Sequence, residues 1–198
     1  MRIFVGVDLQ EAIRDKMATF LAGVSGFAPE ARWVRAESLH VTLKFLGEQK
    51  PEQVEAIQQR LRTISGSEVE IRFAGYGFFP SPRAPRVFWI GIQAGPALAQ
   101  LAAAVDSATA ELGVPREERD YNPHLTLARA GRRSGDPKWR KGDGPNPVFG
   151  VLQKRLAQMG EIEFGTMTAN KFILYQSQLS PAGSKYVKLE RFALRGPS

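Results

Sequence analysis

Residues 40–43 read His-Val-Thr-Leu, and residues 124–127 read His-Leu-Thr-Leu. Both tetrapeptides follow the pattern His-apolar-Thr-apolar, and together they contain the two histidines of the 198-residue chain. They begin about half a chain length apart. This repetition predicts two related lobes, each of which contributes one copy of the same motif.

On a β-strand, residues i and i+2 point to the same face. His40 and Thr42 should therefore share one face, while the apolar residues between and after them point to a core. The same alternation holds for His124 and Thr126. If the two lobes face each other, two imidazoles and two hydroxyls converge across a cleft.

The remaining pattern predicts an α+β fold. Strands are expected at 2–9, 39–46, 68–79, 87–92, 123–130, 161–164, 171–179 and 186–194. Apolar residues at helical spacing predict helices over 10–24, from Pro51 to about 64, over 97–112 and over 149–159. These elements form no simple βαβ series, and no linker divides the chain. We expect one bilobal domain over 1–198, with long loops at 80–86 and 131–147.

The composition favours a globular protein with an anionic partner. Hydrophobic residues make up 43% of the chain, and the formal net charge is +7. A basic balance suits RNA, although many proteins are mildly basic. The chain has no cysteine, which excludes disulfides, thiolate catalysis and Cys-ligated zinc. With no apolar run of membrane-spanning length and no signal-peptide pattern, we expect a cytoplasmic protein without a membrane partner.

Paired histidines and threonines suit phosphodiester cleavage. Water must lose a proton as it attacks phosphorus, and the leaving oxygen must gain one. Histidine titrates near neutral pH, so one imidazole can act as the base and its twin as the acid. Each threonine hydroxyl can donate to a phosphate oxygen. A metal site is the less favoured alternative, since the chain has no His-x-His or HExxH spacing. We expect no metal and no cofactor.

At these motifs the sequence resembles the 2H phosphoesterase superfamily. Within it, the chain is similar to the RNA 2′,3′-cyclic phosphodiesterases, also called 2′-5′ RNA ligases. The likeness covers nearly the whole chain. It lies in residues 2–7 (Arg-Ile-Phe-Val-Gly-Val), 40–47, 86–91 (Arg-Val-Phe-Trp-Ile-Gly), 123–129, 174–179 and 183–186. Tyr121 departs from the family pattern, which often has phenylalanine there.

The resemblance implies a bilobal fold with pseudo-twofold symmetry and a cleft between two antiparallel sheets. It implies hydrolysis of the cyclic phosphate to a 2′-phosphomonoester, with ATP-independent 2′-5′ joining of RNA ends as a further activity. It also implies that His40 is the proton donor and His124 the base, whereas the residues alone leave this order open. Thr42 and Thr126 match phosphate-binding positions, and Arg129 matches an arginine after the second motif. The expected partners are RNA ends, including tRNA halves, and we expect a monomer.

Further contacts are predicted from position alone. Lys44 has the same strand parity as His40 and Thr42, so we expect it to face the cleft and contact substrate. Phe45 is expected in the core. Arg129 has the opposite parity to His124, but a break in parity at the strand end would let it reach phosphate. Loop cations and one aromatic form an RNA-binding hypothesis: Arg83, Arg86, Lys138, Trp139, Arg140 and Lys141.

Two other functions stay open from the sequence. One is the same chemistry on another small substrate, such as a 2′-5′ oligonucleotide or a cyclic nucleotide metabolite. The other is a non-catalytic module that binds RNA ends. A binder needs hydrogen-bond donors or cations, but it does not need two groups that titrate near neutrality.

Overall fold

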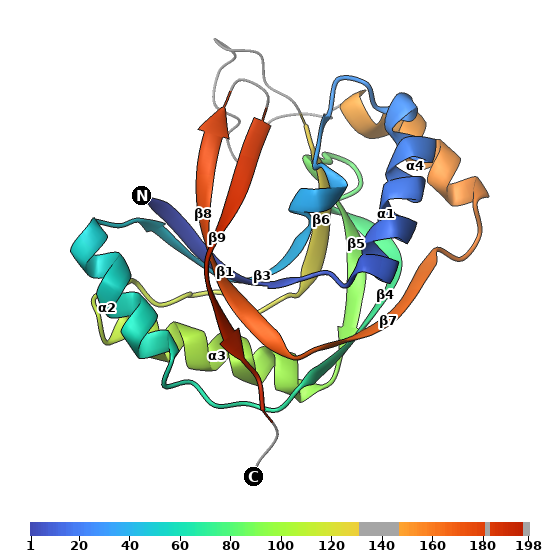
Figure 1. The fold of residues 1–198 in the computed structure, drawn as a ribbon. Helices are drawn as coiled ribbons and strands as arrows, with labels where there is room; N and C mark the ends of the chain where they lie inside the picture. The colour runs from blue at the N-terminus through green and yellow to red at the C-terminus, as the bar shows by residue number, and fades with distance from the viewer. Residues whose placement is uncertain (131–146, 181–182, 196–198) are drawn as a thin grey trace.

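The computed structural model describes residues 1–130, 147–180 and 183–195, and in these ranges the strands form two antiparallel sheets. The first sheet has the order β3-β1-β8-β9 and the second has the order β2-β6-β5-β4-β7 (Figure 1). The strands of the first sheet are β1 (Arg2–Asp8), β3 (His40–Glu48), β8 (Lys171–Ser180) and β9 (Gly183–Ala193). Those of the second are β2 (Arg32–Trp33), β4 (Val69–Phe79), β5 (Val87–Ala94), β6 (His124–Arg129) and β7 (Glu163–Ala169). The predicted α+β fold with two antiparallel sheets is confirmed.

The helices lie outside the sheets, and two of them pack against the sheet that does not contain the strand before them. They are α1 (Glu11–Val24), α2 (Pro51–Leu61), α3 (Pro96–Ala110) and α4 (Gly150–Gln158). Helix α1 follows a strand of the first sheet but packs against β7 of the second, whereas α3 follows β5 and packs against β3. Figure 1 shows α2 and α3 on one side of the molecule and α1 and α4 on the other. The two sheets are therefore tied together by helices that cross between them.

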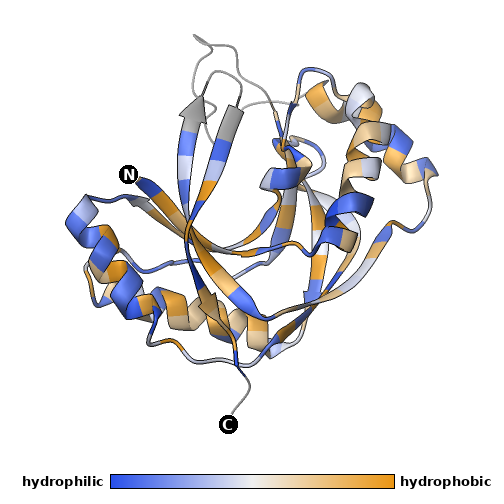
Figure 2. Cartoon of the chain, viewed as in Figure 1, coloured by the Kyte–Doolittle hydropathy of each residue, from blue (hydrophilic) through white to orange (hydrophobic). Residues whose placement is uncertain are grey.

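Apolar spacing explains why the helices form and what they bury. In α1 the buried residues are Ile13, Met17, Leu21 and Val24, which repeat every three or four positions and so share one face. Pro51 and Pro96 open α2 and α3, where a missing N–H costs no helical hydrogen bond. Hydrophobic and hydrophilic residues accordingly alternate along the helices (Figure 2). The core contains buried residues of both sheets. None of the helices in the described ranges is long and apolar enough to cross a membrane.

Each motif strand carries an irregularity at the fourth residue of its tetrapeptide. In the β1–β3 pairing, Gly6 lies opposite Thr42 and Val5 opposite Lys44, so that Leu43 has no opposite residue. In the β5–β6 pairing, Trp89 lies opposite Thr126 and Phe88 opposite Ala128, so that Leu127 is skipped. An extra residue of this kind is a β-bulge, and it reverses the side-chain parity of everything after it.

The bulges decide which residues share the histidine face. The six residues that begin with His40 and the six that begin with His124 have the same burial pattern, and in each set the fourth and fifth residues are both buried. After the bulge, Lys44 turns to the buried side and Phe45 to the histidine side. Arg129 is turned to the side of His124 in the same way. The predicted parity of Lys44 and the core placement of Phe45 are therefore wrong.

Candidate active site

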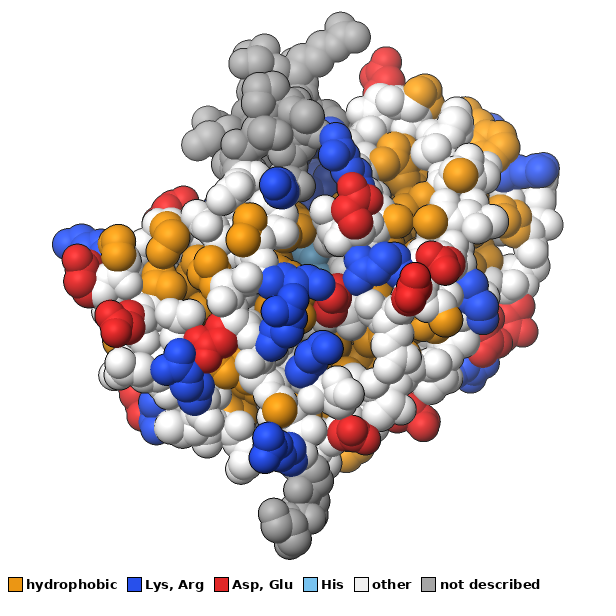
Figure 3. All heavy atoms as spheres, viewed as in Figure 1, with side chains coloured by type: hydrophobic (Ala, Val, Ile, Leu, Met, Phe, Trp, Pro, Cys, Tyr) orange, Lys and Arg blue, Asp and Glu red, His pale blue; other side chains and the backbone are white. Residues whose placement is uncertain are grey.

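A pocket of about 650 Å³ opens between the two sheets. His40 and Thr42 of β3 line it from the first sheet, and Thr126 and Arg129 of β6 line it from the second. Strands β3 and β6 contact each other. In Figure 3, a histidine side chain is visible at the bottom of a hollow that Lys and Arg side chains border. The fold thus brings residues of both motifs to one pocket.

A hydrogen bond across the two sheets supports this arrangement. The Tyr121 hydroxyl, in the segment that leads into β6, donates to the Thr42 carbonyl oxygen at 3.0 Å. His124 lies two residues before Thr126, and so on the same face of β6. The phenol of Tyr121 therefore holds the segment before the second motif against the strand that carries the first.

Both histidines are held by the backbone in the same way. His40 Nδ1 lies 2.8 Å from the Ser38 carbonyl oxygen, and His124 Nδ1 lies 2.9 Å from that of Asn122. A carbonyl oxygen only accepts hydrogen bonds, so Nδ1 must carry the proton in each ring. This leaves Nε2 as the nitrogen that takes up or releases a proton. The two imidazoles are therefore prepared for the same chemistry.

Aromatic rings surround each imidazole. The His40 ring centroid lies 4.6 Å from that of Phe4 and 4.9 Å from that of Tyr186. The His124 ring lies 5.0 Å from Phe79, edge to face. The Tyr175 ring lies 5.8 Å from that of His40, and the Trp89 ring lies 6.4 Å from that of His124. Neighbours of this kind remove water from the rings and disfavour their charged form.

Burial is the main cause that lowers the pKa of both histidines, and that of His40 falls to about 4. The positive charge of Arg129 lowers the pKa of each ring further, which places its guanidinium within electrostatic reach of both. Asp8 acts in the opposite direction on His40. In the unliganded protein at neutral pH, both imidazoles are therefore neutral.

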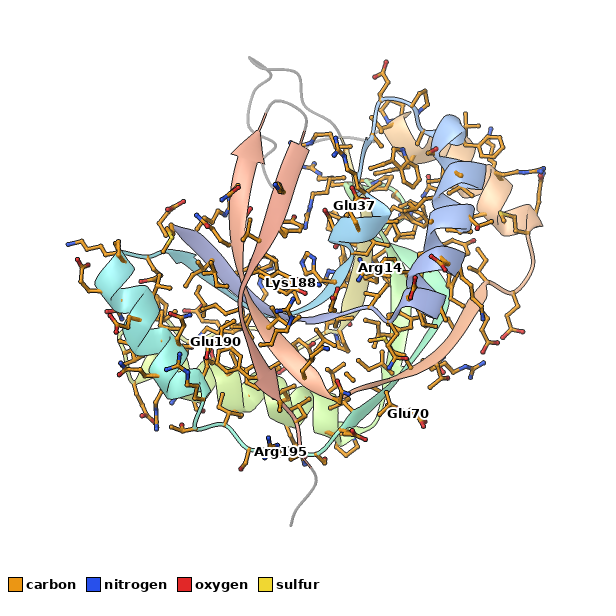
Figure 4. The ribbon with its side chains drawn as sticks, in the orientation of Figure 1. Arg14, Glu37, Glu70, Lys188, Glu190 and Arg195 are labelled. Atoms are coloured by element: carbon orange, nitrogen blue, oxygen red, sulfur yellow. The ribbon has the colours of Figure 1, made fainter. Side chains whose placement is uncertain are left out.

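Asp8 belongs to an ionic network behind His40. It is the β1 residue opposite His40, and its carboxylate accepts hydrogen bonds from Arg14 at 2.6 Å and from Lys188. Although burial raises the pKa of Asp8, these two hydrogen bonds outweigh that effect and keep the carboxylate ionised. Arg14 and Lys188, labelled in Figure 4, approach it from α1 and β9.

Arg14 also supports the turn that orients His40. Its guanidinium donates to the Ala36 carbonyl oxygen at 3.1 Å. Ala36 begins the short 3-10 helix Ala36–Ser38, and the Ser38 carbonyl oxygen fixes the His40 ring. The network therefore holds the first histidine through its backbone as well as through charge.

The structure places Lys44 outside the pocket. Its ammonium lies 2.6 Å from Asp106 Oδ1 and 3.0 Å from Thr109 Oγ1, both on α3, and the residue is 6% exposed. The bulge at Leu43 turns it to the helix side of the sheet. Lys44 therefore does not face the pocket as its strand parity had predicted, and its charge serves a partly buried ion pair.

The bulge has the opposite consequence for Phe45. Its side chain is 60% exposed and lines the pocket. Of the loop cations, Arg83 and Arg86 are not among the described residues that line this pocket. The remaining members of that hypothesis, Lys138, Trp139, Arg140 and Lys141, lie outside the described residues.

Three further arginines of the pocket were not predicted from the sequence. Arg2, Arg32 and Arg35 line it together with Arg129. Arg32 lies directly opposite Arg129 in the β2–β6 pairing. No local motif marks these residues, because their proximity to Arg129 depends on strand pairing between distant segments. The sequence shows only that these residues are basic, and they therefore entered the prediction only through the net charge of the chain.

Two sheets that present matching His-x-Thr-x motifs to one cationic pocket define the class of two-histidine phosphoesterases. The family model described as "LigT like Phosphoesterase" matches residues 7–89 and again residues 90–186. Each match contains one of the two motifs. The chain belongs to the LigT-like phosphoesterase family.

Relatives of known name and structure agree with this membership. The RNA 2′,3′-cyclic phosphodiesterase of Archaeoglobus fulgidus is 35% identical over 97% of this chain and 99% of its own. The protein of the same name from Methanothermobacter thermautotrophicus is 32% identical over 98% and 99%. Among solved structures, TT0787 of Thermus thermophilus is similar with a TM-score of 0.77, at 27% identity over all of both chains. E. coli LigT complexed with 3′-AMP has a TM-score of 0.73, at 28% identity over 98% and 97%.

Proposed function

We propose that this protein is an RNA 2′,3′-cyclic phosphodiesterase, which hydrolyses cyclic phosphate ends to 2′-phosphomonoesters. The observation that carries the proposal is the single pocket lined by His40 and Thr42 from one sheet and by Thr126 and Arg129 from the other. Its relatives from Archaeoglobus fulgidus and Methanothermobacter thermautotrophicus are named for the same activity. His124 is not among the described residues that line this pocket, but it lies two residues before Thr126 on β6 and so shares the strand face of Thr126.

The threonines and the arginine bind the phosphoryl group. Thr42 and Thr126 each donate a hydroxyl hydrogen to a non-bridging phosphate oxygen, one from each sheet. Arg129 neutralises the charge that these oxygens carry. Donors fixed at the place where charge grows stabilise the transition state more than the ground state. Rigid strands hold all three groups, which limits reorganisation during the reaction.

The histidines move the protons. His124 Nε2 accepts a proton from the attacking water as the new P–O bond forms. The bond between phosphorus and the ribose 3′-oxygen breaks, and His40 Nε2 donates its proton to that oxygen. The products are a 2′-phosphomonoester and a free 3′-hydroxyl. His124 ends protonated and His40 neutral, and exchange with solvent restores both.

Substrate binding prepares His40 for its role as acid. Burial keeps its pKa near 4 in the unliganded protein, which disfavours the protonated form. The cyclic diester brings a negative charge into the pocket, and an opposite charge nearby raises the pKa of an imidazole. Asp8 adds to this effect. The substrate therefore promotes the protonation state that its own cleavage needs.

Turnover of a nucleoside 2′,3′-cyclic phosphate tests the proposal. The wild-type protein should release the nucleoside 2′-phosphate, identified by phosphorus NMR, and EDTA should leave the rate unchanged. His40→Gln and His124→Gln should each lower kcat by roughly 10²–10⁴-fold. Circular dichroism shows whether the variants fold. Hydrolysis that survives the double substitution contradicts the proposal, and EDTA-sensitive turnover rescued by a divalent ion favours a metal mechanism.

A substrate panel separates the remaining alternatives. 2′-5′ oligonucleotides and cyclic nucleotide metabolites should be turned over more slowly than RNA ends with a cyclic phosphate. Joining of RNA ends through a 2′-5′ linkage is the reverse reaction at the same site and stays a prediction. Action on tRNA halves, a monomeric state and a cytoplasmic location also stay predictions.

A further inference from the structure

The pocket contains more positive charge than one cyclic phosphate needs. Besides Arg129, it is lined by Arg2 from the first sheet, by Arg32 from the second, and by Arg35 just after Arg32. We call Arg2, Arg32 and Arg35 the arginine rim. All three side chains are exposed at the pocket.

Within the described residues, no carboxylate balances this rim. The lining residues include no Asp or Glu, and within the described ranges no ion pair joins a rim arginine to an acidic side chain. Burial lowers the pKa of Arg129, and the charges of Arg32 and Arg2 lower it further. These guanidinium groups therefore repel one another across a short distance. A bound anion relieves that repulsion.

One phosphoryl group does not account for all four arginines. A 2′,3′-cyclic phosphate is a diester and carries a single negative charge. Thr42, Thr126 and Arg129 already supply its hydrogen bonds and its counter-charge. Guanidinium groups bind phosphates through paired N–H donors, so the rim is suited to a second phosphate.

Other features of the pocket fit a nucleotide chain. Its volume of about 650 Å³ exceeds what a phosphoryl group alone occupies. The exposed ring of Phe45 lies in its wall, and an exposed aromatic ring can stack a base of any sequence. In RNA, the nearest second phosphate is the phosphodiester on the 5′ side of the terminal nucleotide.

We propose that Arg2, Arg32 and Arg35 form a second phosphate subsite, which binds the phosphodiester immediately 5′ of the nucleotide whose cyclic phosphate is cleaved. This inference rests on the proposed function and extends it to substrate choice. The protein selects chain ends over mononucleotides because only a chain supplies the second phosphate.

Matched dinucleotides isolate the charge of that phosphate. Two substrates both end in a 2′,3′-cyclic phosphate, but one has an ordinary internal phosphodiester and the other an uncharged methylphosphonate linkage. The wild-type protein should show a kcat/KM for the charged substrate that is roughly tenfold higher, the worth of a charged hydrogen bond. A ratio near one contradicts the subsite.

Variants assign the effect to the rim. Arg2→Gln, Arg32→Gln and Arg35→Gln should each lower the ratio, and the triple variant should bring it close to one. Arg195→Gln is the matched control: it removes the same charge from an exposed position near the C-terminus, away from the pocket (Figure 4), and should leave the ratio unchanged. A ratio that the triple variant keeps, or that Arg195→Gln lowers equally, overturns the proposal.

The experiment also separates this inference from the proposed function. Hydrolysis of the methylphosphonate substrate depends on the two motifs and Arg129, and not on the arginine rim. If that substrate is cleaved but the ratio is near one, the subsite fails while the proposed function holds. If neither dinucleotide is cleaved, the proposed function fails, and the subsite with it.

Discussion

His40 and His124 have the same backbone tie but different surroundings. In each ring the Nδ1–H donates a hydrogen bond to the carbonyl oxygen two residues earlier. Rings from β1, β8 and β9 enclose His40, whereas Phe79 and Trp89 flank His124. The two His-x-Thr-x motifs could be recognised in the sequence, because each is local. The lowering of the two histidine pKa values could not be predicted, since it depends on neighbours remote along the chain.

The lowered pKa values predict the pH dependence of turnover. One imidazole must be protonated and the other neutral, so kcat/KM should follow a bell-shaped curve. Because both pKa values lie below the ordinary 6.5 in the free protein, the centre of the curve should lie below about pH 6.5. Bound substrate raises these pKa values, so the alkaline limb of kcat should lie at higher pH. Initial rates across pH test this; a kcat/KM curve centred above pH 7 contradicts it.

Thr42 and Thr126 should act through their hydroxyls. Thr42→Val keeps the shape of the side chain but removes the donor to phosphate, and it should lower kcat by roughly 10²-fold or more. Thr42→Ser restores the donor and should recover most of the activity. The same pair of substitutions at Thr126 should behave alike. Equal activity of the valine and serine variants in steady-state kinetics would show that the hydroxyls do not bind the phosphate.

At the scale of the element, the bulges at Leu43 and Leu127 determine which side chains reach the pocket. They bring Arg129 to the histidine face and turn Lys44 away from it. Most of the strands could be predicted to within a few residues, because apolar alternation is strong, but β7 runs over Glu163–Ala169 and so extends well past its expected end at residue 164. The bulges could not, because Leu followed by Lys or Ala fits an uninterrupted strand equally well. Phe45 was misplaced for the same reason.

Lys44 should matter for stability and not for catalysis. Lys44→Met removes the partner of Asp106, a side chain that keeps a contact with Arg116 at 3.4 Å. We expect a loss of about 2 kcal/mol in the free energy of unfolding, below the roughly 3–5 kcal/mol typical of a fully buried pair. Urea unfolding measures this, with Lys154→Met on the surface of α4 as a control. If the Lys44→Met protein folds but its kcat/KM is strongly reduced, Lys44 takes part in substrate binding or catalysis, and this prediction is wrong.

At the scale of the whole molecule, helices α1 and α3 each pack against the sheet that does not contain the strand before them. The two motifs therefore face each other within a single core instead of across a flexible joint. The α+β class and the two sheets could be predicted from the sequence. The crossed helices and the arginine rim could not, because both arise from contacts between segments far apart in the chain.

The buried, neutral His40 should make the whole protein less stable in acid. Its pKa is about 4 when folded and near 6.5 when unfolded, so below pH 6.5 the unfolded chain binds a proton that the folded protein does not. The free energy of unfolding should fall by roughly 2–3 kcal/mol from this group between about pH 7 and pH 4.5. His40→Gln removes the titration, so its stability should fall less over that interval. Urea unfolding at each pH measures this. An equal loss in the free energy of unfolding for the two proteins over this interval would contradict the prediction.

In the proposed reaction both motifs bind the same phosphoryl group. A crystal structure with a nucleoside 2′-monophosphate, the proposed product, would show whether they do. We predict one phosphate whose oxygens lie within hydrogen-bonding distance of Nε2 of His40 and His124 and of the Thr42 and Thr126 hydroxyls. A phosphate bound by one motif alone, with the other histidine out of reach, would contradict the account.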